Sequence, residues 1–78
     1  MACDVMYLVE EHPAGAAPMT YWFQAYRDRE QARAAVSEQA ARCGSDPLEW
    51  RQEGRNLAGF PRAGTPGPAY LIVAVPVI

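Results

Sequence analysis

Two stretches of the chain are apolar at every position, and they predict the centre of a β-sheet. Residues 5–9 and 71–75 contain only aliphatic, aromatic and methionine side chains. A strand that is apolar on both faces is typical of a central position in a sheet. We therefore predict strands at 4–11 and 70–77.

Three further segments predict strands on less continuous patterns. Residues 19–26 and 48–52 alternate between two faces, and 56–60 forms a short strand after the tight connection at Gly54. The first two strands, joined by a loop that contains Pro13 and Pro18, most simply form an antiparallel hairpin. The alternation in 19–26 places four residues on one face, namely Thr20, Trp22, Gln24 and Tyr26.

One amphipathic helix is predicted between these groups of strands, at 28–43. Asp28 is a suitable N-cap, Gln31 stands where a capping box requires it, and Gly44 supplies the position after the last turn. Glu38 and Arg42 are spaced to form an exposed ion pair. The apolar stripe consists of small residues, so the helix can lie close to a sheet: Ala32, Ala35, Val36, Ala40 and Cys43.

The predicted order β-β-α-β-β-β defines an α+β fold in one domain, residues 1–78. A single helix cannot supply the crossovers of a parallel sheet. We therefore expect the helix to cover one face of a mostly antiparallel sheet of four to five strands.

Composition and charge narrow the range of functions. The formal net charge is −2, and all seven basic residues are arginines that are interleaved with acids. This balance argues against a direct nucleic-acid partner, which requires a basic surface. No basic segment precedes the first apolar stretch, and the longest apolar run, 69–78, is half as long as a membrane span. We expect a cytoplasmic protein without membrane contact, in which Cys3 and Cys43 are reduced and buried, the alternative being a disulfide between them.

Catalytic and metal-binding patterns are missing from the sequence. The single histidine, His12, lies in a loop, and no nucleophile–base motif surrounds it. Cys3, His12 and Cys43 lack the spacing of metal ligands, and the adjacent Glu10 and Glu11 point to opposite faces of a strand. We therefore predict a protein that is not an enzyme and has no cofactor or metal.

Aromatic residues exceed what one thin helix can cover, which indicates a binding surface. Trp22 and Tyr26 share a face with Gln24, and aromatic residues mixed with polar ones are typical of interface anchors. We predict a partner-binding site made by Trp22, Gln24 and Tyr26 on the open face of the sheet, with Glu49, Arg51 and Glu53 at a neighbouring strand. In the alternative interpretation, Trp22 is a core residue under the loop 61–68.

In its size, its composition, its lack of catalytic motifs and its lone helix on a small sheet, the chain resembles the anti-CRISPR proteins. These are compact inhibitors from phages and mobile elements of GC-rich bacteria. The resemblance implies a non-catalytic inhibitor that binds a subunit of a CRISPR–Cas effector and blocks target-DNA binding or nuclease recruitment in the host cytoplasm. It assigns no role to individual residues. Two alternatives are a small-ligand binding or sensing domain, with a pocket between the helix and loop 61–68, and a homodimer whose open faces pair; the chain is otherwise expected to be a monomer.

Overall fold

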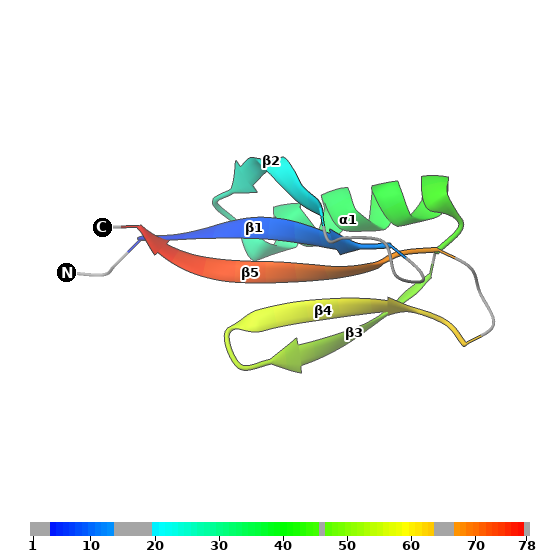
Figure 1. Cartoon of the computed structure of the whole chain (residues 1–78). Helices are drawn as coiled ribbons and strands as arrows, with labels where there is room; N and C mark the ends of the chain where they lie inside the picture. Colours follow the sequence, from blue (N-terminus) through cyan, green and yellow to red (C-terminus); the bar gives the residue numbers. More distant parts are fainter. Residues whose placement is uncertain (1–3, 14–19, 46, 64–66, 78) are drawn as a thin grey trace.

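The chain forms one helix and five strands in a computed structural model that describes residues 4–13, 20–45, 47–63 and 67–77 (Figure 1). The α+β class and the predicted order of elements are confirmed. The elements are β1 (Asp4–His12), β2 (Thr20–Tyr26), α1 (Arg29–Cys43), β3 (Leu48–Glu53), β4 (Asn56–Pro61) and β5 (Ala69–Val77).

The strands form a single antiparallel sheet in the order β2-β1-β5-β4-β3. The two unbroken apolar runs occupy β1 and β5, which pair along their full length. Their predicted central position is confirmed, as is the antiparallel β1–β2 hairpin. The edges of the sheet are β2 and β3.

Helix α1 begins and ends as its sequence predicts. Asp28 Oδ1 accepts a hydrogen bond from the Glu30 backbone N–H at 2.9 Å, and Gly44 adopts the left-handed conformation with φ of 78°. Such a φ favours glycine, because a Cβ would be strained there. Glu38 and Arg42 form the expected exposed ion pair, with 2.8 Å between Oε1 and Nη2.

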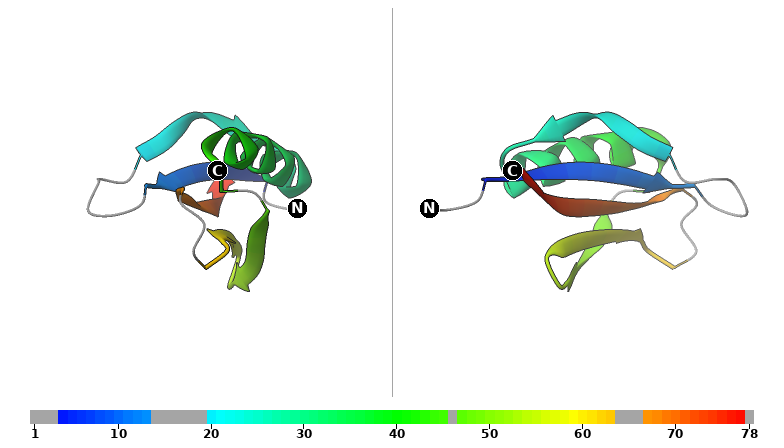
Figure 2. Two further views of the ribbon diagram at one scale, coloured as in Figure 1. Left: turned by 90° about the vertical axis from the view of Figure 1, so that its right-hand side faces the viewer. Right: turned by 60° about the vertical axis from the view of Figure 1, so that its left-hand side comes forward.

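The helix lies across one face of the sheet and packs against β1, β2 and β5 (Figure 2). Of its predicted apolar stripe, Ala32, Val36 and Ala40 are completely buried. The prediction that Cys43 is buried is wrong, since its side chain is exposed. The chain turns at Gly44, and Ser45, which is fully buried, takes the inner position at the end of the helix instead.

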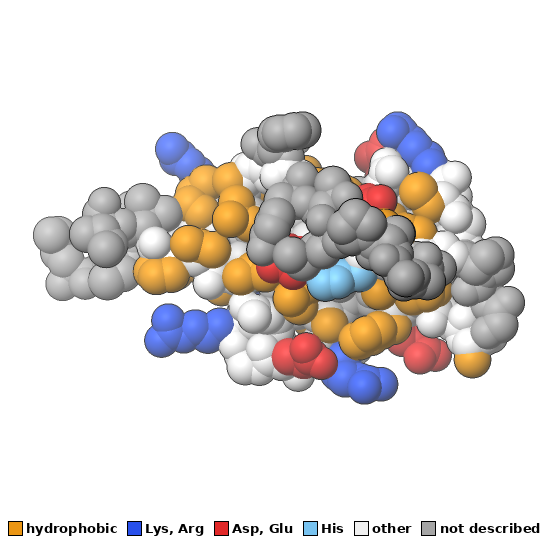
Figure 3. Space-filling model, in the orientation of Figure 1, with side chains coloured by type: hydrophobic (Ala, Val, Ile, Leu, Met, Phe, Trp, Pro, Cys, Tyr) orange, Lys and Arg blue, Asp and Glu red, His pale blue; other side chains and the backbone are white. Residues whose placement is uncertain are grey.

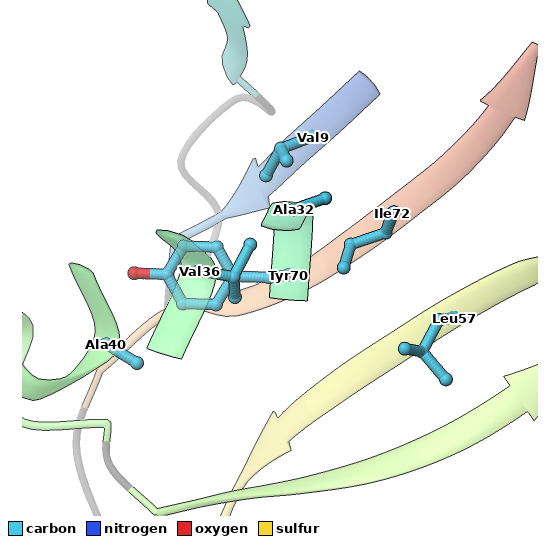
Figure 4. Close-up of a cluster of buried hydrophobic side chains, with 7 residues drawn as sticks. All are labelled: Val9, Ala32, Val36, Ala40, Leu57, Tyr70 and Ile72. Atoms are coloured by element: carbon cyan, nitrogen blue, oxygen red, sulfur yellow. The ribbon is translucent and has the colours of Figure 1, made fainter. Parts of the chain in front are cut away.

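Large side chains from the sheet fill the space beneath the small helical residues (Figure 4). Val9 lies opposite Ile72, and Ile72 lies opposite Leu57, so the three form one row across β1, β5 and β4. Tyr70 completes the cluster from the same face and is 1% exposed. Burial of each aliphatic side chain contributes about 1.5–3 kcal/mol, so this row and the helix stabilise each other.

Candidate protein-binding face

The face of the sheet opposite α1 carries a patch of apolar side chains. Residues directly opposite each other in a sheet share a face, and Leu8 lies opposite Val73 while Met6 lies opposite Val75. These four side chains are partly exposed. Leu71 and Phe60 extend the patch across β5 and β4, and we call these six residues the open-face patch.

Charged side chains of β3 border the open-face patch. Glu49, Arg51 and Glu53 are exposed and alternate in sign along the strand. The Arg51 guanidinium lies 5.3 Å from the centre of the Phe60 ring, which places it over the patch. Figure 3 shows hydrophobic side chains over β1 and β5, with acidic and basic side chains alternating along the rim at β3. The prediction that these three residues lie on a strand next to Trp22 and Tyr26 is wrong, since β3 and β2 are opposite edges of the sheet. Their role in binding stays a prediction.

A second polar pair lies on β1 at the same face. The prediction that His12 lies in a loop is wrong, because β1 extends to His12, which pairs with Ala69. His12 Nε2 is 3.1 Å from Glu10 Oε1, and Glu10 lies opposite Leu71. Among the charged side chains of β1 and β3 on this face, Glu10, Glu49 and Glu53 supply three carboxylates and Arg51 supplies one guanidinium. Carboxylates therefore outnumber guanidinium groups on the rim that these two strands form.

The predicted location of Trp22 and Tyr26 on the open face is wrong. Trp22 meets Tyr70 edge to face, with 6.1 Å between the ring centres and 76° between the planes, and its Nε1 donates to Glu11 Oε1 at 3.2 Å. Tyr26 packs against the same core cluster. The alternation of β2 groups these residues correctly, but α1 covers the face that they share. Gln24 is exposed and stands in the part of β2 where the register with β1 shifts.

The open-face patch itself was not predicted, although the sequence contains the information for it. The unbroken apolar runs indicate strands that are covered on both sides. A lone helix covers only one face, so half of each run remains uncovered. The uncovered apolar surface is thus formed mainly by aliphatic residues of β1 and β5, whereas the prediction placed aromatic residues there.

Two hydroxyl groups are buried near the end of the helix. Ser45 Oγ and Tyr70 Oη have no hydrogen-bond partner among the described residues. Burial, reinforced by the negative charge of Glu11 and by Cys43, raises the pKa of the Tyr70 phenol above its ordinary value. A Cβ on Gly67 would collide with Ser45 Oγ, so the end of the loop before β5 packs directly on this position.

Groups for other chemistry do not gather in the described part of the chain. Within it, no three His, Cys, Asp or Glu side chains are close enough to hold a metal ion. Cys43 Sγ accepts a hydrogen bond from Gln39 Nε2 at 3.4 Å. Cys3 and residues 14–18 of the predicted loop at 12–18 lie outside the described residues. None of the helical residues described here builds a segment of the length and apolarity that a bilayer crossing requires.

Comparisons with protein-family models, with curated proteins and with solved structures found no match to this chain. The fold and the surface define the class instead. It is a small α+β domain in which one helix seals one face of an antiparallel sheet and leaves an apolar, acid-rimmed face uncovered.

Proposed function

We propose that this chain is a non-catalytic protein-binding inhibitor that docks its partner on the open-face patch. The observation that carries the proposal is the row of partly exposed aliphatic side chains on β1 and β5 opposite the helix. Contiguous apolar surface with a polar border is typical of protein interaction sites.

The charged rim is needed as well as the patch. Covering a half-exposed aliphatic side chain contributes about 1 kcal/mol. Association itself costs about 4–15 kcal/mol in lost freedom of motion. The apolar contacts of Leu8, Val73 and their neighbours therefore leave little surplus, and complementary charges at Glu49, Arg51 and Glu53 supply specificity and faster association.

The acidic rim favours a partner surface with an apolar centre and basic groups around it. Proteins that hold DNA carry basic surfaces of this kind, since they displace phosphate counterions. A DNA-binding subunit of a CRISPR–Cas effector meets this description, and the small size of the chain fits an inhibitor of the anti-CRISPR type. Occupation of that surface would block target-DNA binding without any turnover.

Purified effector complexes test the proposal directly. Each complex, loaded with guide RNA, is offered labelled target duplex, and DNA binding is measured by mobility shift as this protein is added. We expect binding to fall linearly until one copy is present per effector. Inhibition that deepens with time below that ratio would indicate catalysis and contradict the proposal.

Matched variants locate the site. Leu8→Gln removes apolar contact from the patch, and Glu53→Gln removes one rim charge; we expect each to weaken inhibition by about tenfold, close to 1.4 kcal/mol. Glu38→Gln removes the same charge from the outer side of α1 and leaves inhibition unchanged. If no effector is inhibited, or if Leu8→Gln inhibits as strongly as the unaltered protein, this function or this face is wrong.

A further inference from the structure

The outer edge of β3 is a regular strand edge with free backbone groups. The β3–β4 hairpin runs without a register shift from Leu48 opposite Pro61 to Glu53 opposite Asn56. Its two-residue loop begins with Gly54 at φ of 63°, and no described non-glycine residue has a positive φ, which indicates a type II′ turn. The closing bond of such a turn directs the Glu53 carbonyl towards β4.

The alternation of an antiparallel ladder then determines which backbone groups are free. The backbone N–H and C=O groups of Glu53 point towards β4, and so do those of Arg51 and Glu49. The backbone groups of Gln52, Trp50 and Leu48 point away from β4. Figure 1 shows β3 as the outermost strand of the sheet. Three residues on this edge therefore present unsatisfied donors and acceptors in the register of another strand.

The side chains of β3 leave this edge clear. The Arg33 guanidinium lies 5.3 Å from the centre of the Trp50 ring, and Arg29 Nη1 donates to Gln52 Oε1 at 3.3 Å, so both β3 side chains are held on the helix side. Arg51 is held over Phe60 on the other face. The opposite edge of the sheet, β2, differs, because its pairing with β1 is interrupted by a register shift.

We infer that β3 pairs with β3 of a second copy of this chain, antiparallel about a two-fold axis centred on Trp50. Trp50 then lies opposite Trp50 of the second copy, and Leu48 lies opposite Gln52 of the second copy. All the outward backbone groups of these three residues find partners across the axis. Pro47, which has no N–H to offer, falls opposite Glu53 of the second copy, at a position where no bond across the axis is required.

Charge selects this register over the others. When the pairing is centred on Trp50, Glu49 of each copy lies opposite Arg51 of the other. Both pairs occupy non-hydrogen-bonded positions, where side chains are closest. Centred on Arg51, the pairing would place Glu49 opposite Glu53 and the two arginines opposite each other. Centred on Gln52, only 51–53 of each strand would overlap before the turn. Edge strands commonly avoid pairing with another chain by carrying Pro, Lys or a bulge. The charges of β3 instead alternate so that two antiparallel copies of the strand attract each other.

The inferred dimer does not depend on the proposed inhibition, because dimerisation can be measured with no partner protein present. It would join the uncovered faces of two copies into one continuous surface. The pairing also differs from a dimer in which the open faces are stacked against each other, because it uses the edge and leaves the open-face patch exposed.

Charge exchange tests the inferred dimer by sedimentation equilibrium over a concentration series. Glu49→Arg and Arg51→Glu each place like charges opposite each other, and we expect each to raise the dimer dissociation constant at least about tenfold. An equimolar mixture of the two variants restores both attractive pairs and should form the heterodimer. The double variant Glu49→Arg/Arg51→Glu should dimerise like the unaltered chain, and circular dichroism confirms that each variant is folded.

Glu53→Arg is the matched control, because Glu53 lies opposite Pro47 of the second copy and its exchange should leave dimerisation unchanged. A chain that stays monomeric up to about 1 mM, the weak end of specific association, would overturn the inference. So would a dimer that is unaffected by both single exchanges, or one that is lost on Leu8→Gln while the exchanges have no effect.

Discussion

The Tyr70 hydroxyl shows what a single buried group costs this small domain. Its ring is part of the core, yet Oη has no hydrogen-bond partner among the described residues. A buried polar atom without a partner costs about 1–3 kcal/mol. We therefore expect Tyr70→Phe, which keeps the ring and its contact with Trp22, to raise the free energy of unfolding by about 1 kcal/mol in urea denaturation.

Alkaline pH provides the control for this prediction. The pKa of Tyr70 is raised in the folded state, because the folded protein favours the neutral phenol over the charged phenolate. The associated stability is fully present below the unfolded pKa of about 10 and is lost as the pH rises above it. Tyr7 and Tyr26 are unchanged in Tyr70→Phe, so the stability gap between variant and unaltered protein should widen above about pH 10. A constant gap would show that the hydroxyl is not buried as described.

At the scale of the element, the β3–β4 hairpin depends on a glycine that faces an aromatic ring. A Cβ built on Gly59 would lie 3.0 Å from Trp50 Cζ3 and 3.1 Å from Leu48 Cδ1. Gly59→Ala should therefore displace the Trp50 ring and lower the free energy of unfolding by about 1–2 kcal/mol. Thermal denaturation and tryptophan fluorescence measure the two effects.

The same substitution in a Trp50→Leu background isolates the contact. With the ring removed, Gly59→Ala should cost less than in the unaltered chain. An equal cost in both backgrounds would mean that the backbone of β4, and not the ring, requires glycine at position 59.

The helix and the central strands could be predicted because their determinants are local. Asp28 and Gly44 cap α1 at the predicted ends, and the apolar runs identify β1 and β5 as central. Each described strand end lies within one residue of its predicted position, and pairing accounts for the added residues, as at Glu53 opposite Asn56. Local composition was sufficient for these features.

The face covered by the helix could not be predicted in the same way. Alternation shows that Trp22 and Tyr26 share a face, but it does not show whether α1 or solvent lies against that face. This depends on the path from β2 into α1 and on the fit of Ala32, Val36 and Ala40 over Val9 and Ile72 (Figure 4). Of the predicted site residues, Glu49, Arg51 and Glu53 consequently lie beside the open-face patch. Trp22 and Tyr26 lie on the side that α1 covers.

On the scale of the whole molecule, the fold divides into a covered part and a flanking hairpin. Helix α1 packs on β1, β2 and β5, whereas β4 joins β5 by pairs from Leu57 to Gly59 only. Asn56 Oδ1 extends this junction by accepting the Ala74 backbone N–H at 3.1 Å. The hairpin is therefore expected to open as a separate unit at lower free energy than the rest.

Native-state hydrogen exchange measures this difference amide by amide. We expect the inward amides of β3 to exchange with a lower opening free energy than those of β1 and β5. Asn56→Ala should lower the value for the hairpin by about 1 kcal/mol and leave the central strands unchanged. Arg42→Ala, which removes only an exposed ion pair of α1, is the control and should leave the hairpin unchanged. Equal opening energies throughout would show that the sheet unfolds as one unit.

The outward amides of β3 report on assembly in the same experiment. In a single copy, Leu48, Trp50 and Gln52 direct their N–H groups away from β4, so they should exchange without protection at low concentration. Pairing of two copies would protect these three amides as the concentration rises, while the inward amides of Glu49 and Arg51 would change only through the added stability of the hairpin. Glu49→Arg should abolish the concentration dependence. The alternation of protected and unprotected amides along β3 therefore distinguishes an edge-paired dimer from a dimer of stacked faces, in which the outward amides would remain unprotected at every concentration.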